Sequence, residues 1–214
     1  MTKNKYTFED LVAIVSRLSA PDGCPWDREQ THESILGSVI EEAYEVIDAF
    51  GKGDRTAIVE ELGDLMLQSV FHADIARREG SFDIGDVVSA LCKKLVSRHS
   101  HVFGDSIATD AKSSIGVWEA NKDKEKSDLT LRAKLESIPK SLPALMRAAK
   151  VIKKIDKSDI DLSKNTDDTQ NTTPISTQEL EAELVRVVRA AIAGGHDPEM
   201  VLKGAVDKII AKVT

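Results

Sequence analysis

The chain has 214 residues, of which 41% are hydrophobic and only 4% aromatic, and its formal net charge is -7. A chain of this length can bury a substantial core, and its composition favours helices packed through aliphatic side chains. The negative charge opposes the broad positive field that sequence-independent binding of nucleic acid requires, so we expect no nucleic-acid partner.

The N-terminal part of the chain predicts a short helix and a turn. Its first residues, MTKNKYTFED, have no apolar core of signal-peptide length, and no later apolar stretch approaches the roughly 20 residues of a membrane span. We therefore expect a cytoplasmic protein with no membrane contact. Apolar residues recur at helical spacing from Tyr6 to about Ser19. In the loop that follows, Asp27 and Gln30 are spaced like a helix-start capping box.

Two longer helices joined by a tight reversal are predicted next. The first covers about Glu33 to Phe50, with a buried stripe formed by Leu36, Ile40, Ala43, Ile47 and Phe50. Residues 51–54, Gly-Lys-Gly-Asp, suit a turn between antiparallel helices. The second covers about Arg55 to Arg78, and its apolar residues beyond Asp64 predict that most of its circumference is buried.

The remaining segments are also predicted to be helical. A helix capped by Asp83 runs to about His99, and a shorter one covers about Ile115 to Lys126. No segment shows sustained period-two alternation, so the prediction is an all-α fold. We place the end of a first domain at residue 126, which gives domains of residues 1–126 and 127–214.

The second domain differs from the first in amino-acid composition. A basic helix is expected from about Ala144 to Lys157, and two more are expected over Gln178–Ala193 and Pro198–Val213. Residues 163–177, SKNTDDTQNTTPIST, are polar and low in apolar residues, which predicts a polar linker between these helices.

The two long helices carry acidic residues at helical spacing. Glu42 and Glu45 lie three residues apart on the first helix. Glu61 and Asp64 have the same spacing on the second. Residues three apart occupy neighbouring turns of one helix face, and a short connecting turn lets both pairs face the same gap. The pattern therefore predicts a cluster of four carboxylates between the helices.

A divalent metal is the interpretation of this cluster that we favour. A solvated acidic surface is the ordinary alternative for an isolated E-E-x-x-E motif. Burial of the second helix argues against it, because burying several carboxylates together raises their pKa values unless a cation compensates. Four carboxylates without a histidine or thiolate favour magnesium, or manganese, over zinc. Gly63 costs about 0.5 to 1 kcal/mol inside a helix relative to alanine, which indicates close approach of a neighbour or ligand, or a packing role.

The next helix offers candidate phosphate ligands. Lys94 and Arg98 lie one turn apart, and arginine can hold phosphate oxygens bidentately while lysine acts as a point charge. Far from an anionic site they would be ordinary surface cations, but beside a magnesium cluster we interpret them as phosphate ligands. Trp118 and Trp26 can each stack on a nucleobase or pack in a core or lid. The chain has no G-x-x-x-x-G-K-[ST] loop that would cradle phosphates instead.

Together these motifs resemble the MazG family of all-α nucleoside triphosphate pyrophosphatases. The resemblance covers nearly all of residues 8 to 126 and rests on an ordered set of segments: Gly23–Asp27, Gln30-Thr31, Glu41–Glu45, Glu60–Asp64, Arg98-His99 and His101–Asp105. It implies a four-helix MazG-like bundle. It also implies cleavage of nucleoside triphosphates between the α and β phosphates, giving a nucleoside monophosphate and pyrophosphate, with broad base tolerance and a house-cleaning role.

The resemblance further implies roles for individual side chains. It implies that magnesium is held by four carboxylates, those of Glu42, Glu45, Glu61 and Asp64. It implies that Lys94 and Arg98 bind the triphosphate and that Trp118 lies by the nucleotide. Metal ions would neutralise phosphate charge and activate a water, and the spare carboxylate of Glu41 is a candidate general base.

The second domain departs from the family pattern. Full-length members commonly carry a second copy of the domain, and residues 138–148 look like the opening of that copy. Where its acidic helix should follow, this chain has the polar stretch, and residues 179–183 replace the E-x-x-D element imperfectly. We therefore expect residues 127–214 to be a degenerate, truncated second copy that cannot assemble four ligands.

Two functional alternatives remain open from the sequence. One is a catalytically weak or inactive helical module that senses nucleotides or binds a partner while keeping the metal site. The other keeps the fold but changes the substrate, as in a dUTP or dCTP pyrophosphatase or a phosphoribosyl-ATP hydrolase. Members of this fold usually pair through their helices, so we also expect a homodimer.

Overall fold

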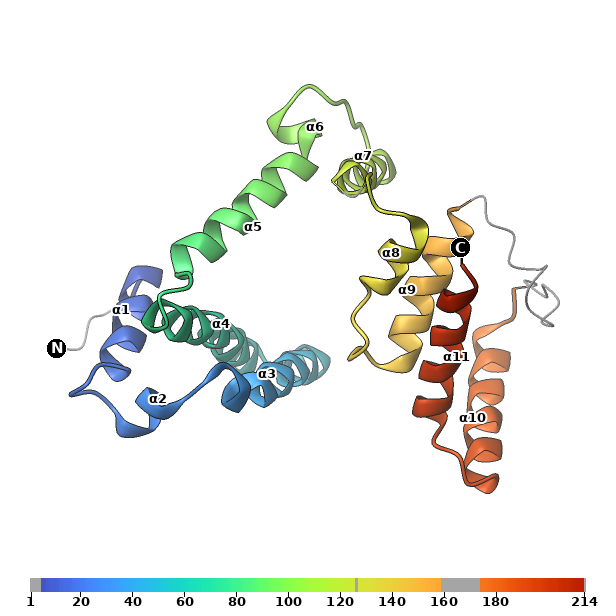
Figure 1. Cartoon of the computed structure of the whole chain (residues 1–214), viewed down its shortest axis with the longest axis horizontal. Helices are drawn as coiled ribbons and strands as arrows, with labels where there is room; N and C mark the ends of the chain where they lie inside the picture. Colours follow the sequence, from blue (N-terminus) through green and yellow to red (C-terminus); the bar gives the residue numbers. More distant parts are fainter. Residues whose placement is uncertain (1–4, 126, 159–173, 214) are drawn as a thin grey trace. The chain divides into compact units, whose positions relative to one another are not determined.

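The chain is entirely helical wherever the structure describes it. The computed structural model describes residues 5–125, 127–158 and 174–213, and over these ranges it has eleven α-helices and no strand (Figure 1). This confirms the prediction of an all-α protein. None of the described helices combines the length and the apolar character needed to cross a membrane.

The helices form two compact units, Met1–Trp118 and Glu119–Thr214, called unit 1 and unit 2 below. The division falls inside helix α7 (Ala111–Lys124), before the boundary that we expect at residue 126. Unit 1 contains α1 (Phe8–Leu18), α2 (Pro25–Glu29), α3 (His32–Lys52), α4 (Arg55–Arg78), α5 (Ile84–Arg98) and α6 (Ser100–Phe103).

The start of α3 differs from the prediction. A short helix, α2, occupies the segment in which the sequence predicts a capping box of Asp27 and Gln30. The capping box belongs instead to α3, where the Thr31 hydroxyl accepts from the Ser34 N–H at 3.3 Å and the Ser34 hydroxyl accepts from the Thr31 N–H at 3.0 Å. Pro25 at the first position of α2 explains the difference, because its fixed φ favours a helix start at that point.

A tight reversal brings α4 back along α3. Gly53 ends α3 with a φ of 69°, a left-handed conformation that glycine adopts without a Cβ penalty. The Asp54 side chain then caps α4 by accepting from the N–H groups of Thr56 and Ala57, at 2.9 and 3.2 Å. The helices α3 and α4 therefore form the hairpin that the sequence predicts.

The core of unit 1 surrounds the C-terminal half of α4. Its buried members are Val15, Ile35, Val70, Phe71 and Ile75. The predicted buried stripe of α3 is wrong, since Ile40 is 62% and Ile47 is 63% exposed, and Leu36, Ala43 and Phe50 are exposed as well. The N-terminal half of α4 also exposes apolar side chains, namely Val59, Leu62 and Met66. Within unit 1, α3 and α4 cover each other on one side only, which leaves their other apolar faces without a covering helix of that unit.

A pair of histidines joins the start of α3 to α4. The imidazole rings of His32 and His72 stack with their centroids 5.1 Å apart, and their Nδ1 atoms lie 2.8 Å from each other. The Nε2 atom of His32 is also 3.7 Å from a carboxylate oxygen of Glu79. Because one Nδ1 must accept the proton that the other donates, the contact requires at least one neutral ring.

We expect this pair to make stability depend on pH. Partial burial, and then the charge of His32, hold the pKa of His72 below its ordinary value of 6.5. The folded chain therefore binds fewer protons than the unfolded chain below pH 6.5, and stability is lost as the pH falls from 6.5 towards the lowered pKa. The melting temperature of the wild type should fall over this range, and that of His72→Gln should fall less, as followed by circular dichroism.

A histidine in unit 2 provides the control for this comparison. His196 is exposed, so His196→Gln should keep the wild-type pH dependence. The carboxylates that titrate near this pH range are the same in the wild type and in both variants. Their effect on the melting temperature therefore cancels when the three proteins are compared. Equal pH dependence in the wild type and in His72→Gln would contradict the prediction.

Unit 2 has its own hydrophobic core. Its helices are α8 (Leu131–Glu136), α9 (Ala144–Asp156), α10 (Thr177–Ala193) and α11 (Pro198–Lys212). The core consists of buried residues from α8, α9, α11 and the segments next to them: Leu135, Ile138, Ala148, Val151, Ile155, Val206, Ile210 and Val213. Helix α10 contacts α11 but buries none of its residues. Residues 163–173 of the predicted polar linker lie outside the described residues. The last residue of this linker, Thr177, is the first residue of α10, and the Ser176 side chain caps that helix.

Among the described residues of unit 2, one charged side chain is buried. Arg147 on α9 is 2% exposed, and its guanidinium is 2.8 Å from a carboxylate oxygen of Asp207 on α11. This ion pair links the two helices that form the core.

Candidate metal centre

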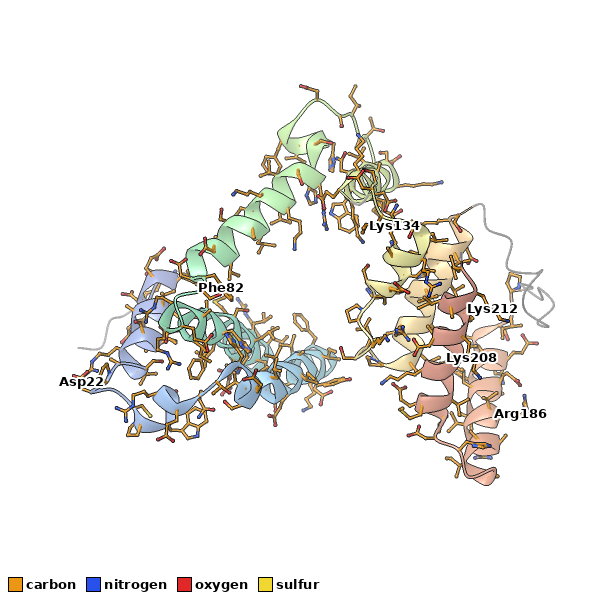
Figure 2. All side chains as sticks on the ribbon, in the orientation of Figure 1. Asp22, Phe82, Lys134, Arg186, Lys208 and Lys212 are labelled. Carbon is orange, nitrogen blue, oxygen red and sulfur yellow. The ribbon has the colours of Figure 1, made fainter. Side chains whose placement is uncertain are left out.

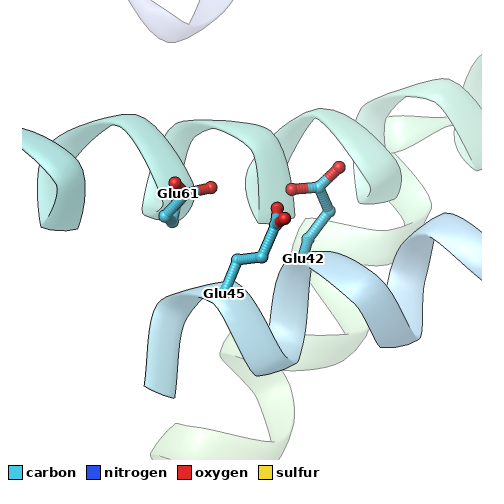
Figure 3. A group of neighbouring side chains, drawn as sticks. All are labelled: Glu42, Glu45 and Glu61. Carbon is cyan, nitrogen blue, oxygen red and sulfur yellow. The ribbon is translucent and has the colours of Figure 1, made fainter. Parts of the chain in front are cut away.

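Three carboxylates of unit 1 converge between α3 and α4. Glu42 and Glu45 come from α3 and Glu61 from α4, and one oxygen of each lies within 4.8 Å of the others (Figure 3). The spacing of three residues puts Glu42 and Glu45 on one face of α3, and the short reversal at Gly53 turns α4 towards that face. The helix pair therefore gathers acidic side chains that are far apart in sequence.

The electrostatics of the cluster oppose its full ionisation. Partial burial raises the pKa of Glu42, and the charges of Asp64, Glu45, Glu61 and Glu41 raise it further, in that order. Partial burial is also the largest cause of the raised pKa of Glu61. The negative charges of Glu45, Glu60 and Asp64 raise it further, in that order. A cation bound among these oxygens would remove the cost of holding the charges together.

Two further carboxylates lie beside this group of three. Asp64, one turn after Glu61, is half-buried, and among the neighbouring charges it has the largest effect on the pKa of Glu42. Its oxygens do not belong to the group that meets within 4.8 Å. Glu41 is exposed and has the smallest effect on Glu42. The structure thus brings three of the four expected ligands together and places the fourth close enough to act on them.

The donor set matches a hard divalent cation. All three side chains offer oxygen, and ligands of one octahedral magnesium at about 2.0–2.1 Å are themselves about 3–4 Å apart. Small side-chain rotations would bring the three oxygens to that separation. Gly63 lies between Glu61 and Asp64 on α4, and a Cβ there would meet no atom within 4 Å. Close approach of a neighbour in the same chain therefore does not explain this glycine.

Neither predicted phosphate ligand, Lys94 or Arg98, is among the charges that act on the pKa values of Glu42 and Glu61. Helix α5 packs on the unit 1 core through Ile84 at its start, and Lys94 is exposed farther along the helix. No lysine or arginine of the described residues is among the groups that shift the pKa of Glu42 or Glu61.

The two other predicted substrate contacts lie against each other. The guanidinium carbon of Arg98 is 5.4 Å from the centroid of the Trp118 ring, which is a cation–π geometry. Both side chains are half-buried. Trp26, the other tryptophan, is 63% exposed on α2. This contact joins the C-terminal end of α5 to α7.

Comparison with known proteins identifies relatives of this chain. Residues 30–103 match the MazG nucleotide pyrophosphohydrolase domain. A nucleoside triphosphate pyrophosphohydrolase of Escherichia coli K12 is 45% identical over 145 residues, which cover 67% of this chain and 55% of that protein. The Thermotoga maritima protein named nucleoside triphosphate pyrophosphohydrolase/pyrophosphatase MazG is 44% identical over 144 residues, covering 67% of this chain and 54% of its own length.

A longer match extends into unit 2. A nucleoside triphosphate pyrophosphohydrolase of Mycolicibacterium smegmatis is 34% identical over 203 residues, which cover 89% of this chain and 61% of that protein. The chain thus spans between about half and three fifths of the length of these relatives.

Proposed function

Since residues 30–103 belong to the MazG domain family, we propose that this chain is a magnesium-dependent nucleoside triphosphate pyrophosphohydrolase. The observation that carries the proposal is the convergence of Glu42, Glu45 and Glu61 within 4.8 Å, with raised pKa values at Glu42 and Glu61. Cleavage falls between the α and β phosphates and releases a nucleoside monophosphate and pyrophosphate. In keeping with the family resemblance, the proposed role is the clearing of unwanted nucleotides.

The metal ligands in this proposal are the three converging carboxylates together with Asp64. Magnesium fits an all-oxygen donor set, and manganese accepts the same ligands. When bound, the metal supplies positive charge that stabilises the phosphates and lowers the pKa of a water. The side chains of Glu42, Glu45, Glu61 and Asp64 hold it in place and keep α3 and α4 in register around it.

The remaining groups act on the substrate. Arg98 and Lys94 bind the phosphate chain, and the Trp118 ring that supports Arg98 borders the nucleotide. Glu41 is exposed beside Glu42, where it can accept a proton from the attacking water. Glu41→Gln with unchanged turnover would exclude this role for Glu41.

The proposed enzyme is a homodimer. The open apolar faces of α3 and α4 support this, because exposed side chains such as Ile40 and Ile47 follow the helix period that usually faces a core. The four-helix bundle that the family resemblance implies would then be completed by a second copy.

We expect Ile40→Glu to shift the chain from dimer to monomer. A charge in the centre of an apolar interface raises the dimer Kd by about 30-fold or more. The same change at Ile107, which is 85% exposed in the loop before α7, should leave the dimer intact. Light scattering after size exclusion distinguishes the two, and a wild-type monomer at micromolar concentration would contradict the proposal.

Unit 2, in this proposal, is a degenerate second copy of the same domain. The longer match to the Mycolicibacterium smegmatis protein supports a relationship that continues past unit 1. Among the described residues of unit 2, no three carboxylate, histidine or cysteine ligands converge as those of unit 1 do. Metal-dependent chemistry therefore belongs to unit 1.

Product analysis tests the proposed reaction directly. The purified chain is incubated with magnesium and canonical or damaged nucleoside triphosphates, and the products are separated by chromatography. We expect monophosphate and pyrophosphate in equal amounts. Diphosphate and inorganic phosphate as products would indicate cleavage between the β and γ phosphates instead. If no triphosphate gave any product, the result would support the alternative of a catalytically inactive nucleotide-sensing module.

A further inference from the structure

Unit 2 has a concave surface lined by lysines, here called the lysine hollow. It has a volume of about 560 Å³ and lies where the end of α7, helix α8 and helix α9 meet. Its lysines come from all three helices: Lys122, Lys134, Lys150, Lys153, Lys154 and Lys157. Figure 2 marks Lys134 on α8.

The packing of α9 orients the helix face that carries its lysines towards the hollow. Residues 150, 153, 154 and 157 recur at the three- and four-residue spacing of one helix face. Val151 and Ile155 lie in the unit 2 core on the other side of the helix. Because α9 cannot turn without exposing these core residues, its positive face stays at the hollow.

The hollow is strongly positive although the whole chain carries a net charge of -7. Its lysines outnumber its two carboxylates, those of Glu119 and Asp123. Glu119 is already paired with Lys157 at 2.5 Å, and the hydrogen bond from that lysine lowers the pKa of Glu119. Neither of these carboxylates, nor any other among the described residues, pairs with Lys134, Lys150 or Lys153. Lysines held together in this way repel one another unless an anion lies between them.

The lining indicates which anion fits. Lysine ammonium groups bind phosphate oxygens as point charges. None of the described residues that line the hollow is aromatic, so they offer no ring on which a nucleobase could stack. Its volume is that of a small-molecule site, and its lysines line one hollow, whereas a nucleic acid needs a long basic stripe.

We propose that the lysine hollow binds an inorganic oligophosphate, such as pyrophosphate or tripolyphosphate. The phosphate oxygens lie between the lysines of α9 and Lys134 of α8. The site is separate from the acidic cluster of unit 1, and its occupancy requires neither a metal nor turnover.

Calorimetry with sodium tripolyphosphate and the full chain tests the proposal. The titration contains EDTA, because without a divalent cation the carboxylates of unit 1 repel the anion. We expect binding by the wild type, and Lys150→Gln with Lys153→Gln in one chain should weaken it by about tenfold or more, since two charged contacts are lost.

The matched control changes two lysines outside the hollow. Lys140 and Lys208 are exposed residues of unit 2 that do not line it, and Lys208 on α11 is marked in Figure 2. Lys140→Gln with Lys208→Gln should change the affinity by less than about twofold. Equal losses in both double variants, or no binding by the wild type, would overturn the proposal.

A comparison with ATP distinguishes the two sources of an oligophosphate group. Tripolyphosphate should bind as tightly as ATP or more tightly under the same metal-free conditions, since nothing in the hollow holds a base. ATP that binds more than about tenfold more tightly would show that the ligand is a nucleotide and would overturn the choice of an inorganic anion. Failure of hydrolysis by unit 1 would leave this result unchanged, because the titration involves no reaction.

Discussion

Glu61→Gln should lower the rate of triphosphate cleavage by about 100-fold, which is the cost of losing one ligand from a catalytic metal site. The amide keeps the size of the side chain but removes its charge. Glu42 and Glu45 lie on α3, and Glu61 is the only one of the three converging carboxylates that comes from α4. Its loss therefore removes the ligand that α4 gives to this group. Pyrophosphate release, detected as phosphate after addition of an inorganic pyrophosphatase, measures the rate.

The neighbouring Glu60 provides a matched control. It is exposed and is not one of the three converging residues, so Glu60→Gln should retain activity within about threefold. Magnesium should also raise the melting temperature of the wild type and of Glu60→Gln but raise that of Glu61→Gln less, since only an intact site binds the metal tightly. Full activity of Glu61→Gln would contradict the proposed metal centre.

Asp207→Ala should destabilise unit 2 by about 2 kcal/mol. The change leaves the buried guanidinium of Arg147 without its counter-charge. Breaking a fully buried pair costs about 3–5 kcal/mol, and we reduce this figure because the Asp207 side chain is 51% exposed and already hydrated on one side. Urea unfolding followed by far-UV circular dichroism measures the loss in the transition assigned to unit 2.

Removing the buried charge itself should have a smaller effect. Arg147→Met keeps an unbranched side chain of similar length among apolar neighbours, so we expect stability within about 1 kcal/mol of the wild type. Glu136→Ala breaks the exposed pair of Glu136 with Arg132 and serves as a control that should cost about 0.5 kcal/mol or less. If Arg147→Met cost as much as Asp207→Ala, the uncompensated charge would not be the cause.

The sequence alone determined the helices and the acidic motif. Helix α4 begins and ends at the predicted residues, Arg55 and Arg78, because the Asp54 cap before it and Gly80 after it, with a φ of 72°, are local features of the sequence. The spacing of Glu42, Glu45 and Glu61 on two helices joined by a tight turn likewise predicted their convergence. The helix bounds and the turn between the helices depend on neighbours within a few residues, and sequence patterns report such neighbours directly.

The tertiary structure alone decided which faces of the helices are covered. Periodicity placed Ile40 and Ile47 on one apolar face of α3, but only the packing of α3 on α4 showed that this face stays exposed within unit 1. The lysine hollow was also invisible in the sequence, because Lys134 and Lys150 come from different helices and meet only when α8 and α9 pack together. A helix period states which residues share a face, whereas the partner of that face depends on contacts between segments distant in sequence.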